Sequence, residues 1–118
     1  MLTYGVFWLV NDKSKKLMGV PAKRVKETLR ECADAHGWHI VRVSVCRSYV
    51  RLVMQFGPEF IPEDVVNTLK EKTSSVLQQE FPEFAYANGE SFWSKEYLIQ
   101  TTGTIDHAAC KKYIQTQQ

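Results

Sequence analysis

Alternating and buried hydrophobic runs predict the strands of this chain. The opening run Leu2–Val10 is rich in β-branched and aromatic residues, which is typical of a strand buried on both faces. Two further runs, His39–Val45 and Tyr49–Phe56, alternate apolar and polar positions around the polar turn Arg47-Ser48. This pattern predicts an antiparallel hairpin. The residues expected on one face of its first strand are Val41, Val43 and Val45.

Apolar positions at three- and four-residue steps predict two amphipathic helices. The first begins near Pro21, which suits an N-terminal turn, and ends at Gly37. The second begins at Pro62, has two acidic residues in its first turn, and ends before Phe81-Pro82.

The last third of the chain adds one strand and one helix. Residues 92–102 predict a strand, and Thr104 or Asp106 would cap a helix that runs to the C-terminus. The resulting order, β-α-β-β-α-β plus a terminal helix, predicts an α+β, ferredoxin-like fold. We expect one domain, residues 1–118, with an antiparallel sheet and two helices on one of its faces.

Composition limits the class of protein. The 118 residues are 44% hydrophobic and 24% charged, which excludes a disordered chain. No apolar run is long enough to span a bilayer, and the N-terminal run has no basic leader. The three cysteines, Cys32, Cys46 and Cys110, have no zinc-site spacing, so we expect reduced, mostly buried thiols. A cytoplasmic protein is the expectation.

Charge is distributed unevenly along the chain. Residues 1–56 carry ten basic and four acidic groups (+6), whereas residues 57–118 carry five basic and nine acidic groups (−4). The first half therefore has a candidate surface for a polyanion such as DNA, and a solvated face is the alternative. Its candidate cations are Lys13, Lys15, Lys16, Lys23, Arg24, Lys26 and Arg30.

The C-terminal helix carries a possible nucleophile. Tyr113 and Gln117 are four residues apart and so share a helix face, with Lys111 and Lys112 beside the tyrosine. A tyrosine phenol can attack a phosphodiester and hold the DNA covalently. An ordinary amphipathic terminal helix would also explain this spacing.

Several segments together resemble the single-tyrosine transposases of the insertion-sequence 200/605 family, which belong to the HUH nucleases. The matching segments are residues 48–54 (SYVRLVM), 65–77 (VVNTLKEKTSSVL), 80–82 (EFP), 92–97 (FWSKEY), 102–103 (TG) and 112–117 (KYIQTQ). The resemblance implies a homodimer that binds single-stranded or hairpin DNA at transposon ends, with no membrane association. It also implies that Tyr113 is the nucleophile, that Gln117 lies on the metal or phosphate side, that Lys111 and Lys112 bind DNA, and that magnesium or manganese is the ion.

The chain departs from the family at the metal site. The family places a His-hydrophobic-His pair, usually preceded by aspartate, where this sequence has Ser48, Tyr49 and Arg51. Strand alternation still places the side chains of 49 and 51 on one face. A phenol and a guanidinium are not ligands for a hard divalent cation, so we expect this metal site to be lost. Arg51 could instead bind the scissile phosphate.

Three functions remain open from the sequence. The first is a transposase-like protein that binds hairpin DNA and is impaired in metal-dependent cleavage. The second is an active strand transferase that uses Arg51 without a metal. The third is a ferredoxin-like interaction module that has no nucleic-acid partner.

Overall fold

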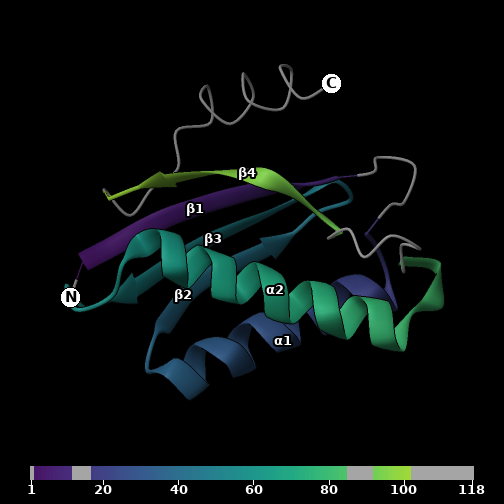
Figure 1. Cartoon of the computed structure of the whole chain (residues 1–118), viewed down its shortest axis with the longest axis horizontal. Coiled ribbons are helices and arrows are strands. Elements are labelled where there is room, and N and C mark those ends of the chain that lie inside the picture. Colours follow the sequence, from purple (N-terminus) through teal and green to yellow (C-terminus); the bar gives the residue numbers. More distant parts are fainter. Residues whose placement is uncertain (1, 12–16, 85–91, 102–118) are drawn as a thin grey trace.

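The strands and helices of the chain follow one another in the predicted order (Figure 1). The computed structural model describes residues 2–11, 17–84 and 92–101. The elements are β1 (Leu2–Val10), α1 (Val20–His36), β2 (His39–Val45), β3 (Tyr49–Phe56), α2 (Pro62–Glu80), the short 3-10 helix η1 (Pro82–Phe84) and β4 (Trp93–Gln100). The predicted C-terminal helix lies outside the described residues.

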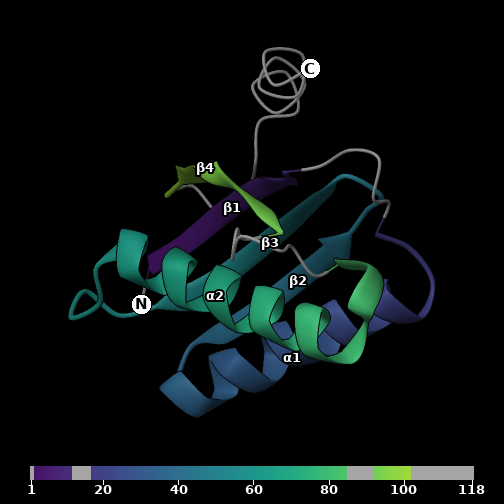
Figure 2. The same cartoon turned by 45° about the vertical axis from the view of Figure 1, so that its right-hand side comes forward.

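The described strands form one antiparallel sheet in the order β2-β3-β1-β4. Both helices cover the same face of this sheet, and Figure 2 shows them side by side beneath the strands. This confirms the predicted α+β, ferredoxin-like arrangement. Neither described helix is long and apolar enough to cross a membrane.

The core lies between the sheet and the helices, and β1 runs through its centre. Residues 4–10 of β1 are all buried, which confirms that this strand is covered on both faces. Val6 and Trp8 join the main cluster with residues of α1 and α2. Phe7 and Leu9 point to the other face, where they form a second, smaller cluster.

Gly37 ends α1 as the sequence predicts. Its φ of 77° lies in the left-handed region, which glycine adopts without steric cost. The N–H groups of Gly37 and Trp38 donate to the carbonyls of Asp34 and Ala33, at 3.2 and 2.9 Å. This pair of hydrogen bonds is a Schellman motif, and it turns the chain directly into β2.

The prediction for Val41 is wrong. The register of β2 against β3 shifts between Ile40 and Arg42, so Val41 has no partner on β3. It is 50% exposed, and Ile40 takes the buried position in its place. Such a bulge breaks the two-residue alternation on which the prediction rested.

Candidate active face and nucleic-acid interface

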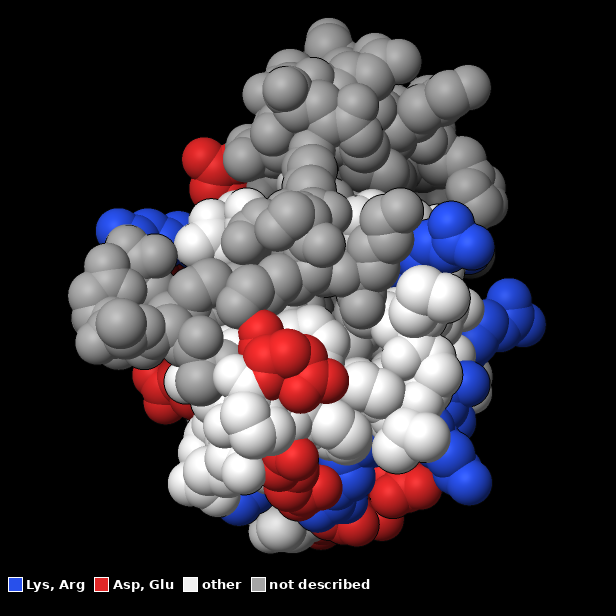
Figure 3. Space-filling model, turned by 90° about the vertical axis from the view of Figure 1, so that its right-hand side faces the viewer, with Lys and Arg blue, Asp and Glu red and all other residues white. Residues whose placement is uncertain are grey.

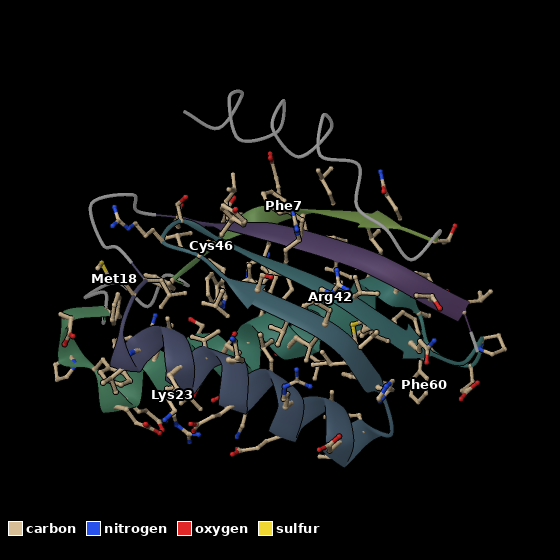
Figure 4. All side chains as sticks on the ribbon, turned by 180° about the vertical axis from the view of Figure 1, so that it is seen from behind. Phe7, Met18, Lys23, Arg42, Cys46 and Phe60 are labelled. Atoms are coloured by element: carbon tan, nitrogen blue, oxygen red, sulfur yellow. The ribbon has the colours of Figure 1, made fainter. Side chains whose placement is uncertain are left out.

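Tyr49 and Arg51 lie on the face of β3 that points away from the helices, which we call the outer face. The alternate residues of β3, Val50 and Leu52 among them, are fully buried against the helices. Because successive side chains of a strand point to opposite sides, positions 49 and 51 share the outer face, as predicted. Figure 4 shows Phe7 of β1 on this side of the sheet, opposite to α1.

Arg51 occupies the middle of the outer face. It is in register with Phe7 on β1 and with Ser44 on β2, and Phe7 is in turn in register with Leu98 on β4. The ring of Tyr49 lies 5.2 Å from the ring of Phe7, centroid to centroid. Arg51, a half-buried residue, therefore adjoins a strip of aromatic and aliphatic residues on the neighbouring strands.

Ser48 lies where β3 begins, and backbone hydrogen bonds fix this point to both neighbouring strands. The carbonyl of Ser48 accepts from the N–H of Val10 at 2.8 Å, and that of Tyr49 accepts from the N–H of Cys46 at 2.8 Å. These bonds set the register of β3 at positions 48–51. Positions 48, 49 and 51, where the resemblance predicts the family's metal motif, therefore lie at a strand start that backbone hydrogen bonds hold in place.

The side chains at these positions do not fit a divalent metal ion. Magnesium and manganese prefer carboxylate or carbonyl oxygens, and imidazole is the other common ligand. Arg51 is permanently cationic and Tyr49 is a neutral phenol at physiological pH. Within the described residues, no group of three His, Cys, Asp or Glu side chains gathers into a metal site. We assign no reaction step to a metal ion at this face.

The basic residues of α1 divide between two sides of the helix. Lys23 and Lys26 are exposed. Arg24 instead faces α2, where its Nε donates to Glu80 Oε1 at 3.0 Å and its Nη1 lies 3.6 Å from Glu27 and from Glu31. Chiefly because of the hydrogen bond to Glu80, the pKa of Arg24 is raised. The structure thus separates Arg24 from Lys23 and Lys26, and a DNA-binding role for all three remains a prediction.

Several predicted site residues lie outside the described part of the chain. They are Lys13, Lys15 and Lys16 in the first loop, and Lys111, Lys112, Tyr113 and Gln117 near the C-terminus. Their roles stay predictions.

The two described cysteines differ in burial. Cys32 and Cys46 are free thiols, with Cys32 buried and Cys46 half-buried. Burial raises the pKa of Cys32, so its thiol stays protonated at neutral pH. The prediction of mostly buried thiols is confirmed for Cys32 and only in part for Cys46.

Lys70 is a buried cation that the sequence reasoning missed. It is 7% exposed, its Nζ donates to the carbonyl of Ser94 at 2.6 Å, and it lies 5.9 Å from the centre of the Tyr97 ring. Burial lowers the pKa of Lys70. Its spacing in the sequence could have predicted this burial. Lys70 lies four residues after Val66 and three before Thr73, on the apolar stripe of α2.

Two buried hydrogen bonds also attach α2 to β4. The indole Nε1 of Trp93 donates to the hydroxyl of Thr73 at 2.7 Å, and the N–H of Phe92 donates to the hydroxyl of Ser74 at 3.2 Å. Together with Lys70, they fix the start of β4, the edge strand that precedes the segment carrying Tyr113.

Two known proteins from Deinococcus radiodurans resemble this chain, one in sequence and one in structure. A relative from Deinococcus radiodurans, the ISDra2 transposase TnpA, is 26% identical over 117 residues, covering 98% of this chain and 84% of the relative. The crystal structure of a putative transposase from Deinococcus radiodurans R1 superposes with a TM-score of 0.86 at 25% identity, covering 98% of this chain and 90% of that one.

A more distant structure shares the fold. It is a REP-associated tyrosine transposase bound to a REP hairpin, with a TM-score of 0.63 at 5% identity, covering 96% of this chain and 62% of that one. The family model described as "Transposase IS200 like" matches residues 1–117, nearly the whole chain. The chain therefore belongs to the IS200-like transposase family of insertion sequences.

Proposed function

We propose that this transposase binds single-stranded or hairpin DNA at transposon ends and is impaired in metal-dependent cleavage. The observation that carries the proposal is the pair Tyr49 and Arg51 on the outer face of β3, where the family has its metal-binding histidines. A tyrosine transposase of the same fold has been solved with a bound REP hairpin, which supports hairpin DNA as the partner class.

Tyr113 is the proposed nucleophile for any strand cleavage that survives. Its phenolic oxygen would attack the phosphorus of a phosphodiester, form a P–O bond and displace the 3′-oxygen, which leaves as a hydroxyl after taking a proton. The 5′-phosphate would remain on the tyrosine until a second 3′-hydroxyl reverses the step. Gln117, four residues after Tyr113, would lie on the metal or phosphate side of the site, as the resemblance implies.

A second candidate function is cleavage without a metal, with Arg51 as the phosphate clamp. Arg51 is half-buried on a central strand beside the buried Phe7. A guanidinium binds phosphate oxygens in a bidentate manner, and such bonds strengthen where water is excluded. The absence of any DNA binding would favour the third function, an interaction module.

The test is covalent capture of DNA under two ionic conditions. The protein is incubated with single-stranded hairpin oligonucleotides in manganese or in chelator, and adducts are separated on denaturing gels. We expect retention of the oligonucleotide on a native gel, without an adduct on the denaturing gel in either condition. An adduct that forms equally in chelator and is lost in Arg51→Ala would establish the second function, and an adduct that requires manganese would refute the impaired site.

We infer a homodimer from the family resemblance. In the described sheet, β2 and β4 are the edge strands, and an unpaired edge can extend a sheet into a second copy. Light scattering in solution tests this inference, and a monomer mass would overturn it.

A further inference from the structure

Exposed basic side chains follow the margin of the molecule that α1 and the edge strand β2 form. Figure 3 shows Lys and Arg side chains along its right-hand margin, the side that Figure 4 views face on. We call four exposed side chains at this margin the basic track. They are Lys23, Lys26 and Arg30 of α1 and Arg47 of the turn after β2.

The cations of α1 in this track lie on one side of the helix. Lys23, Lys26 and Arg30 are three and four residues apart, which aligns them along the helix surface. On the neighbouring side of the helix, Arg24 pairs with acidic residues of α1 and α2. Within the described residues, none of the four track side chains makes an ion pair, so their charges are available to a ligand.

The turn at Gly37 brings β2 back alongside α1. The N–H of Leu17, three residues before α1, donates to the carbonyl of Arg47 at 2.9 Å. Arg47 therefore lies near the start of α1, where Lys23 is. The track thus runs along α1 and continues to the turn between β2 and β3. Arg42 is not part of it, because its register with Val53 places it on the outer face.

The chemistry of this margin fits a regularly charged polyanion. Alternate N–H groups of β2 face outward, because β2 pairs only with β3 in the described sheet. Phosphate oxygens of DNA accept hydrogen bonds from lysine, arginine and backbone N–H groups. We propose that the basic track binds the phosphodiester backbone of DNA, as a contact separate from Tyr49 and Arg51. This inference rests on the proposed function only in taking DNA as the partner.

The expected signature is a steep dependence of affinity on salt. If all four side chains contact phosphates, the track contributes a slope of log K against log salt of about −3.6 on duplex DNA and about −2.8 on single strands. The contacts are sequence-independent, so scrambling the oligonucleotide should leave this contribution unchanged.

The experiment compares two pairs of substitutions in the full chain. Lys26→Gln with Arg30→Gln removes two track charges, and Lys72→Gln with Lys95→Gln removes two exposed charges from α2 and β4 as the matched control. Fluorescence anisotropy with labelled hairpin, duplex and single-stranded oligonucleotides is measured between about 50 and 200 mM salt.

We expect the track variant to reduce the magnitude of the slope by about 2 on at least one probe, and the control to leave it unchanged. If the slope falls only with the duplex probe, the track binds a hairpin stem. If the slope falls only with the single-stranded probe, the track binds the single-stranded DNA that flanks a hairpin. Equal losses in both variants, or none in the track variant, would overturn the proposal. Circular dichroism verifies that each variant is folded.

Failure of this inference can be separated from failure of the proposed function. Tyr113→Phe should retain the wild-type salt slope, because Tyr113 contributes no charge to the track. If no variant or condition gives a covalent adduct while the track variant loses slope, DNA binding by the track stands without cleavage. If adducts form and the slope is unaffected, the track is wrong and the catalytic assignment stands.

Discussion

At the scale of single residues, positions 49 and 51 share the outer face of β3, where the family resemblance places a metal site, but their side chains are not metal ligands. The sequence was enough to predict their shared face, because alternation along β3 is regular and the structure confirms it. It could not predict that Tyr49 packs on Phe7, since that contact depends on the register of β1 against β3.

Restoring the imidazoles should restore metal binding. We predict that Tyr49→His combined with Arg51→His binds manganese, which the wild type should not do at this face, because the new side chains are ligands aimed at one side of the sheet. Isothermal titration with manganese measures the gain. The variant Val53→His with Gln55→His, further along the same face, is the positional control, and equal binding by both pairs would refute a specific site.

The buried Lys70 gives a prediction about pH. Its folded-state pKa lies below the ordinary value of 10.5, so between these two values the unfolded chain binds more protons than the folded one. Stability due to this group therefore rises with pH across that window. We expect the free energy of unfolding of the wild type to increase relative to Lys70→Met as the pH approaches 10.5.

Urea denaturation of both proteins at a series of pH values measures this difference. Lys72→Met controls for removal of a lysine from the same helix. A difference between wild type and Lys70→Met that stays constant with pH would contradict the lowered pKa.

At the scale of elements, the helix ends were predictable and the strand bulge was not. Pro21, Pro62 and Gly37 act locally, through fixed φ or freedom in the left-handed region, so the sequence alone locates them. The bulge at Val41 depends on how β2 aligns with β3, which is a tertiary property. The attachment of α2 to β4 is likewise a tertiary property. The sequence shows that Thr73, Ser74 and Lys70 are polar residues on an apolar stripe, but it does not show which residues at the start of β4 they contact.

We predict that the indole–hydroxyl hydrogen bond between Trp93 and Thr73 couples these two elements energetically. Trp93→Phe and Thr73→Val should each destabilise the fold, and a double-mutant cycle should give a coupling free energy of about 1 kcal/mol. Thermal and urea unfolding supply the values. Thr68→Val removes a similar hydroxyl–carbonyl bond from α2, to Asp64, and should show no coupling to Trp93→Phe.

At the scale of the whole molecule, the uneven charge of the chain becomes a difference between surfaces. The sequence showed the excess of +6 in residues 1–56, but it could not show which cations are neutralised. Packing of α1 against α2 pairs Arg24 with Glu80 across the two helices, and it leaves Lys23, Lys26 and Arg30 exposed. If the proposals hold, DNA binds along α1 and is cleaved at the outer face of the sheet.

The last prediction concerns how two copies share one reaction. In the family that this chain resembles, the tyrosine often completes the active site of the opposite subunit. We therefore infer that Tyr113 of one subunit acts at the outer face of the other, and action within one chain is the alternative. Two proteins are mixed that should each be inactive alone. One is the wild type, which has Tyr113 but no metal ligands at 49 and 51, and the other carries Tyr49→His, Arg51→His and Tyr113→Phe.

In a mixed dimer, the repaired face of one chain would meet the tyrosine of the other. We therefore expect an adduct in manganese, carried by the wild-type chain, which an affinity tag distinguishes on a denaturing gel. The same repaired chain with Tyr113 intact is the positive control, and it should form the adduct without mixing. The mixture can react only if the two proteins exchange subunits, and mass measurement of the tagged pair verifies this exchange. If the control reacts and the exchanged mixture does not, Tyr113 acts at the outer face of its own chain.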